Sequence, residues 1–246
     1  MTDRTARVAP PRRRRAAPAL AAACVPAVLA AVPAVASAAP VITSEDVCLR
    51  PGQMPSGQLV SPPLRITGAG FTPGAPVRLR RGARAETVLA AADGTITARL
   101  SVLDLLVGGG PRSTPFTVAA TDTGGPGGSP PPQGVSNALR LRAAPLTFRA
   151  SPKRARPSAR VRFRLSGFRP GAVIWAHYRY RGKVRANVAL GRASRPCGLL
   201  TTRRRQIPVS DPGTGTWRVQ FDHRRKFTPR ARPRVRATID VFRAVR

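Results

Sequence analysis

The chain of 246 residues carries 43 Lys and Arg residues against 10 Asp and Glu residues, a net charge of +33 at pH 7. With two histidines and three cysteines, it offers no cluster of the kind that holds zinc, and we expect neither a metal nor a cofactor. No helix-turn-helix, zinc-finger or RNA-recognition signature is present, so the charge does not indicate a specific nucleic-acid partner.

The first 38 residues predict a secretory signal peptide. A basic region that ends at Arg15 precedes an apolar run over residues 16–36, and Ala36-Ser37-Ala38 is a small-x-small cleavage site. An uncleaved membrane anchor is the alternative, although three prolines in the run weaken a spanning helix. We therefore expect a secreted or extracytoplasmic protein, and an association with the cell envelope fits that location.

The charge divides the remaining chain into two unequal parts. Residues 39–143 have a net charge of +4, whereas residues 144–246 have a net charge of +24. Codon bias in a GC-rich genome explains the preference for Arg over Lys, but it does not explain why the second part has so few acids. Each part is long enough to bury its own core. We predict two domains with these bounds; a boundary near residue 130, in the Gly/Pro-rich segment 124–134, is the alternative.

Apolar and polar residues alternate with a period of two in several segments, which predicts half-buried β-strands. These segments are 96–102, 116–120, 160–165, 217–221 and 235–241. Asp93-Gly94 and Arg181-Gly182 are predicted hairpin turns. No helix beyond a short turn within 102–107 is expected.

The sequence contains an internal repeat. Gly-Phe-x-Pro-Gly-Ala occurs at residues 70–75 and again at residues 167–172. Pro-Gly suits the centre of a type II turn, and the preceding Phe would close the end of a core. Further along, residues 95–97 match 216–218, and 116–122 match 235–240. Because the offset grows, the second copy is predicted to carry an insertion around residues 178–205.

These motifs resemble bacterial immunoglobulin-like repeats, through the Gly-Phe-x-Pro-Gly turn, the Asp-Gly turn and the strand Phe116–Asp122. Residues 185–194 and 215–222 are similar to uncharacterised exported β-rich proteins of high-GC bacteria. The resemblance implies an all-β fold, with two tandem immunoglobulin-like β-sandwich domains after the signal peptide. Such modules serve adhesion, spacing or ligand binding on secreted and cell-surface proteins. The shared motifs are structural, so no active site is carried over.

Two cysteines, Cys48 and Cys197, lie beyond the signal peptide. An even pair in an oxidising compartment predicts a disulfide. Cys197 with His177 would imitate a thiol protease, but a disulfide at Cys197 would exclude that chemistry. Asp222 and His223 are neighbours, and neighbours on a strand point to opposite faces. We expect no enzymatic activity; a hydrolase that uses His177 or His223 is the weaker alternative.

A basic surface on the second domain is the leading functional signal. Rows of guanidinium groups match phosphate geometry and attract polyanions, and Trp175, Tyr178 and Tyr180 would stack on sugars or bases. The predicted binding residues are Arg160, Arg162, Arg164, Arg203, Arg204, Arg205, Arg224, Arg225, Lys226, Arg230, Arg232, Arg234 and Arg236. The hypothesis is a non-enzymatic module that binds an anionic cell-wall polymer or another extracellular polyanion. The alternative is a passive structural or spacer protein.

Overall fold

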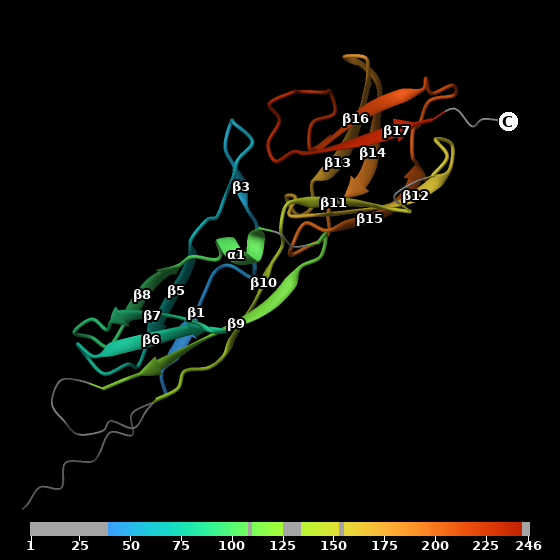
Figure 1. Cartoon of the computed structure of the whole chain (residues 1–246). Coiled ribbons are helices and arrows are strands. Elements are labelled where there is room, and N and C mark those ends of the chain that lie inside the picture. Colours follow the sequence, from blue (N-terminus) through green and yellow to red (C-terminus); the bar gives the residue numbers. More distant parts are fainter. Residues whose placement is uncertain (1–38, 108–109, 125–133, 153–154, 243–246) are drawn as a thin grey trace, which may run out of the picture. The chain divides into compact units, whose positions relative to one another are not determined.

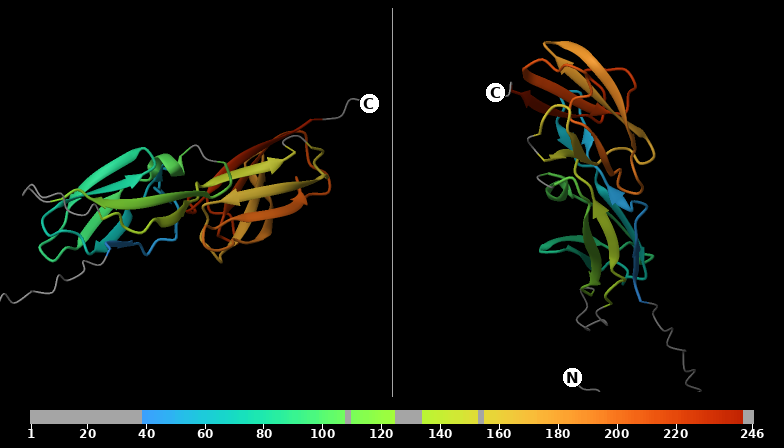
Figure 2. Two further views of the ribbon diagram at one scale, coloured as in Figure 1. Left: turned by 90° about the horizontal axis from the view of Figure 1, so that it is seen from below. Right: turned by 90° about the vertical axis from the view of Figure 1, so that its right-hand side faces the viewer.

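The computed structural model describes residues 39–107, 110–124, 134–152 and 155–242. The predicted signal peptide, residues 1–38, lies outside this described part. As predicted, the fold is all-β and consists of two β-sandwiches in tandem (Figure 1). Strands of the first sandwich are blue to yellow-green in Figure 2, and those of the second are yellow to red.

The first sandwich packs a sheet of order β1-β5-β8 against a sheet of order β2-β10-β9-β6-β7. Strand β2 pairs with β10 in parallel, whereas the other strand pairs of these two sheets are antiparallel. The elements are β1 (Val41–Thr43), β2 (Cys48–Leu49), β5 (Leu64–Ala69), β6 (Pro76–Arg81), β7 (Arg84–Leu89), β8 (Ile96–Leu100), α1 (Leu103–Leu106), β9 (Thr114–Asp122) and β10 (Leu139–Ala143). A separate small hairpin consists of β3 (Gly52–Gln53) and β4 (Leu59–Val60).

The second sandwich packs a sheet of order β11-β12-β15 against one of order β14-β13-β16-β17. The elements are β11 (Thr147–Ser151), β12 (Arg160–Ser166), β13 (Val173–Tyr180), β14 (Lys183–Arg192), β15 (Leu200–Arg205), β16 (Gly215–Asp222) and β17 (Val235–Val241). The order β7-β6-β9-β10 in the first sandwich matches β14-β13-β16-β17 in the second. Three strands facing four is the layout of an immunoglobulin-like sandwich.

Each sandwich has its own hydrophobic core. The first core runs in sequence from Ile42 to Ala143, and the second includes buried residues from Leu146 to Val241. In the second, the Phe148 ring lies 4.3 Å from the Phe221 ring and 5.6 Å from the Phe163 ring, between centroids. Full burial of each such ring contributes about 1.5–3 kcal/mol. Packing of strands from both sheets onto these rings therefore holds the two layers together.

The predicted internal repeat is present as a repeated corner. The amide of Phe71 donates to the carbonyl of Gly94 at 3.1 Å, and the amide of Phe168 donates to the carbonyl of Gly198 at 3.3 Å. Both phenylalanines are buried in their cores, as the motif suggested. The Pro-Gly glycines of the two corners have φ angles of +71° and +79°, which the predicted type II turn requires.

The later part of the predicted repeat alignment is wrong by one strand. Residues 95–97 lead into β8, which pairs with β5, whereas residues 216–218 lie on β16, which pairs with β13. Because β9 pairs with β6, β9 corresponds to β16, and β10 corresponds to β17. The shared Thr-rich and apolar patterns are common to many strands, so the sequence alone did not separate them.

The two predicted hairpin turns differ in outcome. Arg181 and Gly182 both have positive φ and join β13 to its partner β14, so this hairpin prediction is confirmed. Asp93-Gly94 forms a turn, but it joins β7 to β8, which belong to different sheets. The expected short helical turn is α1.

Cys48 and Cys197 form a disulfide, with their Cα atoms 5.4 Å apart. Cys48 lies in β2 of the first sandwich, and Cys197 lies in the connection between β14 and β15 of the second. The cysteines are 149 residues apart, a separation at which the chain-entropy model gives a stabilisation of about 5 kcal/mol.

Close packing of Gly198 against the Phe168 backbone, at the corner of the second sandwich, predicts a difference between two glycine substitutions. Gly171→Ala meets nothing within 4 Å, so only the positive φ opposes it, at about 1–2 kcal/mol. Gly198→Ala has the same backbone problem, and its Cβ would overlap the carbonyl of Phe168. We expect a further loss of about 1–3 kcal/mol in the free energy of unfolding. Urea denaturation followed by tryptophan fluorescence measures this, because both tryptophans belong to the second sandwich. Equal midpoints for the two variants would contradict this close packing.

Candidate functional site

The outer face of the β11-β12-β15 sheet is a surface of arginine side chains. Alternation on β12 turns Val161, Phe163 and Leu165 into the core, so the arginines between them point outward. Across the strands Arg160 lies opposite Arg205, Arg162 opposite Arg203, and Arg149 opposite Arg164. We call these six residues the arginine face: Arg149, Arg160, Arg162, Arg164, Arg203 and Arg205.

The charge of the arginine face is not neutralised by nearby acids. Strands β11, β12 and β15 contain no Asp or Glu. Within the described residues the ion pairs are Arg81–Asp104, Arg84–Asp104 and His177–Asp222, and none involves this face. Like charges directly opposite each other destabilise a sheet. The three arginine pairs therefore weaken the fold slightly and produce a positive surface.

The structure places the other predicted residues elsewhere. Arg204 lies opposite Val161 and so does not belong to the row of the arginine face, although it is exposed and donates to the carbonyl of Arg203. Arg236 lies on the outer face of the second sheet. Arg234 is only 8% exposed and donates to the carbonyl of Ala231 at 3.2 Å, which leaves little of it for a ligand. The remaining five are exposed in the loop between β16 and β17: Arg224, Arg225, Lys226, Arg230 and Arg232.

Sequence reasoning missed Arg149 and misassigned an aromatic residue. The short strand β11 was not predicted, although Phe148 and Ala150 on either side of Arg149 pack against the core. Tyr178 is 1% exposed and belongs to the core, so its assignment as a stacking platform is wrong. Tyr180 stacks on Trp217 and donates its hydroxyl to the carbonyl of Thr214.

A buried polar cluster lies on the outer side of the other sheet. His177 and Asp222 are 0% exposed and Gln220 is 3% exposed, although Gln220 lies between the core residues Val219 and Phe221 and was expected to face water. The loop between β16 and β17 covers them: its Phe227 ring stands edge-on to His177, and its Thr228 carbonyl accepts from Gln220 at 2.8 Å.

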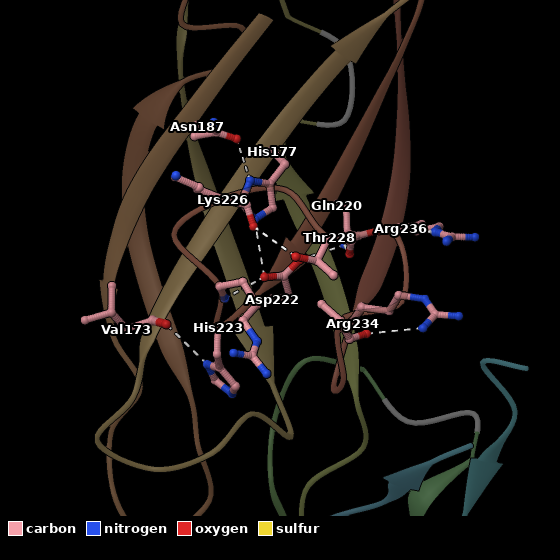
Figure 3. Close-up of polar contacts among 12 residues, drawn as sticks. Val173, His177, Asn187, Gln220, Asp222, His223, Lys226, Thr228, Arg234 and Arg236 are labelled. Atoms are coloured by element: carbon pink, nitrogen blue, oxygen red, sulfur yellow. Dashed lines mark hydrogen bonds and ion pairs between the residues drawn. The ribbon is translucent and has the colours of Figure 1, made fainter. Parts of the chain in front are cut away.

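Hydrogen bonds satisfy this cluster (Figure 3). His177 places Nδ1 2.6 Å from Oδ1 of Asn187 and Nε2 3.3 Å from Oδ1 of Asp222. The Asp222 carboxylate also accepts from the Gln220 side chain and from the Arg224 amide, each at 2.7 Å. Burial opposes the charged imidazole, but hydrogen bonds to Asp222 and Asn187 outweigh it and raise the pKa of His177. Two acceptors at the ring favour the doubly protonated form.

His223 has a different environment. Its Nε2 accepts from the amide of Arg169 at 3.1 Å, so its Nδ1 carries the proton and donates to the carbonyl of Val173 at 3.2 Å. Burial lowers the pKa of His223, and the nearby positive charge of Arg169 adds to the effect. The fold therefore favours the charged form of His177 and the neutral form of His223.

These positions weigh against the hydrolase alternative. His177 is closed to a substrate, and both ring nitrogens of His223 are engaged. Cys197 is in the disulfide. Among the described residues, no three His, Cys, Asp or Glu side chains gather as a metal site would require. None of the helices in the described part of the chain is long and apolar enough to cross a membrane.

Comparisons with known proteins give no family. No protein-family model and no curated protein sequence matches the chain. Its structure is similar to the tetra-tandem repeat in the extending region of a large adhesion protein, with 14% identity, a TM-score of 0.27, and coverage of 83% of this chain and 49% of that one. It is also similar to a Ca²⁺-stabilised adhesin that helps an Antarctic bacterium reach out and bind ice, with 9% identity, a TM-score of 0.30, and coverage of 82% and 47%. The chain spans about half the length of each, and scores of this size carry nothing about function over to it.

The two histidines predict a stability maximum near neutral pH. His177 has a raised pKa, so its contribution is complete below its ordinary value of 6.5 and is lost as pH rises through the folded-state value. His223 has a lowered pKa, so its contribution is complete above 6.5 and is lost as pH falls through the folded-state value. Urea midpoints from pH 5 to 9, read by tryptophan fluorescence, measure both effects.

Variants separate the two contributions. We expect His177→Gln to remove the decline on the alkaline side and His223→Gln to remove the decline on the acid side. If His177→Gln kept the alkaline decline unchanged, the charged pair with Asp222 would not be its source.

Proposed function

We propose that the chain is an exported, non-enzymatic structural module that associates with an anionic polymer of the cell envelope through the arginine face. The observation that supports this most is the set of three cross-strand arginine pairs on strands without an acidic residue. When a polyanion binds, its phosphates offset the repulsion between the paired arginines and its counterions are released. Both effects lower the free energy of the bound state.

Two further observations support the setting. The Cys48–Cys197 disulfide fits an oxidising compartment outside the cytoplasm. Guanidinium groups bind phosphate bidentately, and strand geometry spaces alternate residues of β12 by about 7 Å. A flexible chain of phosphodiesters can follow such rows without a specific pocket, which is why an envelope polymer suits this surface.

The proposal predicts steeply salt-dependent binding. Purified wall teichoic acid, DNA and neutral dextran are titrated against the protein from 50 to 300 mM salt. We expect teichoic acid to bind and dextran not to bind. Six engaged guanidinium groups would give a slope of about −4 to −5 in log K against log salt. Arg160→Gln/Arg162→Gln/Arg164→Gln should reduce the magnitude of that slope by about 2–3.

The matched control neutralises three exposed arginines of the first sandwich, Arg78→Gln/Arg80→Gln/Arg140→Gln. Both triple variants lose the same net charge, but only the first changes the arginine face. It should also raise the urea midpoint slightly, because it removes three like-charge pairs. Equal losses of affinity in both variants would reduce the effect to net charge, absence of binding at low salt would leave a passive spacer, and tighter binding to DNA would point to a different polyanion.

A further inference from the structure

A groove of about 420 Å³ lies on the outer side of the β13-β16-β17 sheet, on the face opposite the arginine face. Three arginines from three neighbouring strands line it, Arg179, Arg218 and Arg236, together with Phe227 from the covering loop. The volume is in the range of small-ligand sites. This groove is separate from the surface proposed above, and its residues other than Arg236 were not predicted from the sequence.

Two of the three arginines, Arg179 and Arg236, are held in place by the protein. Arg179 lies directly opposite Arg218 on the neighbouring strand, its guanidinium carbon lies 4.7 Å from the centre of the Phe227 ring, and its Nη2 donates to the carbonyl of Gly182 at 3.0 Å. Arg236 donates to the carbonyl of Pro229 at 3.0 Å. Fixed guanidinium groups lose less conformational entropy when they bind an anion than free ones do.

The groove has donors but no negative charge. No Asp or Glu is among its lining residues. Asp222, the nearest acid in sequence to the loop, is buried and engaged with His177, Gln220 and Arg224. Among the described residues, Arg179 supplies the one buried side-chain polar atom without a hydrogen-bond partner, its Nε. This buried Nε leaves the Arg179 guanidinium short of hydrogen bonds, and an oxyanion bound to the same guanidinium group would offset that deficit.

The surroundings indicate what the anion is attached to. The Phe227 ring gives part of the wall an apolar character, and Thr238 adds a hydroxyl, whereas Val219 and Ala237 turn their side chains into the core. A second hollow of about 450 Å³ adjoins the Arg179–Arg218 pair, and its lining includes Tyr180, Thr214 and Thr216, whose hydroxyl donates to the Asp240 carboxylate at 2.6 Å. The arginine pair therefore lies between two small spaces with mixed apolar and hydroxyl walls.

We propose that this groove binds the phosphate ester of a sugar or polyol. The three guanidinium groups hold the tetrahedral oxyanion, and the adjoining hollows hold the hydroxylated part against Phe227 and the threonines. The site is independent of polymer binding at the arginine face, since the two surfaces belong to different sheets of the sandwich.

Titration calorimetry and NMR test the proposal with the whole protein. The probes are glucose 6-phosphate, glucose 6-sulfate, inorganic phosphate and glucose, at 50 mM salt. We expect glucose 6-phosphate to bind, inorganic phosphate to bind about tenfold more weakly, and glucose not to bind. The Arg179 Nε–H resonance should shift on binding, because the anion binds the same guanidinium group. Equal or tighter binding of glucose 6-sulfate would keep the oxyanion site and assign it to sulfate esters.

Matched variants locate the site. Arg218→Gln/Arg236→Gln should weaken glucose 6-phosphate at least about thirtyfold, since each substitution removes a charge-assisted contact. Arg185→Gln, an exposed arginine on β14 outside the groove, and the Arg160/Arg162/Arg164 triple variant should bind as the wild type does. The proposal fails if glucose 6-phosphate does not bind, if the double variant binds as tightly as Arg185→Gln, or if glucose 6-phosphate binds no better than inorganic phosphate.

Discussion

Face-to-face packing of two sheets is the interaction on which the rest of this structure depends. Alternate side chains of the inner strands are used for it, as Phe163 and Phe221 show by meeting Phe148 from different strands. The alternate residues are thereby free of any packing role unless another segment covers them. The two outer faces of the second sandwich differ in this respect. One is exposed and carries arginines, and the other is covered by the loop between β16 and β17.

The arginine face shows that a fold can tolerate a surface whose like charges destabilise it. An exposed like-charge pair costs some tenths of a kcal/mol, so the three arginine pairs take only a small part of what the aromatic core and the disulfide supply. Composition explains why the residues are Arg rather than Lys. It does not explain why all three strands lack acids, since a single Asp or Glu on β12 or β15 would relieve the repulsion. The proposed binding of a polyanion would account for this pattern, because acids on these strands would weaken it.

The sequence was most informative where a property depends on near neighbours. Alternation located β12, β16 and β17, and the Gly-Phe-x-Pro-Gly motif located both corners. What it could not give was the pairing of distant strands. His177 meets Asp222 because β13 lies beside β16, and Asp93-Gly94 fails to close a hairpin because β8 joins the other sheet. The packing of the covering loop onto the sheet could not be predicted either. A basic run such as residues 224–226 indicates a solvent-exposed loop, and nothing in the sequence showed that Phe227 beside it would pack against His177.

The covered face links the buried cluster to the groove above it. Once the loop excludes water from the sheet, His177, Asp222 and Gln220 must find partners within the protein, because an unpaired buried charge would cost far more than the loop contributes. Two of those partners belong to the loop itself, the Thr228 carbonyl and the Arg224 amide. The same attachments fix where Phe227 lies, and Phe227 in turn supports Arg179. The position of Arg179 thus follows from the hydrogen-bonded cluster beneath it, so the polar residues of this face support part of the groove surface.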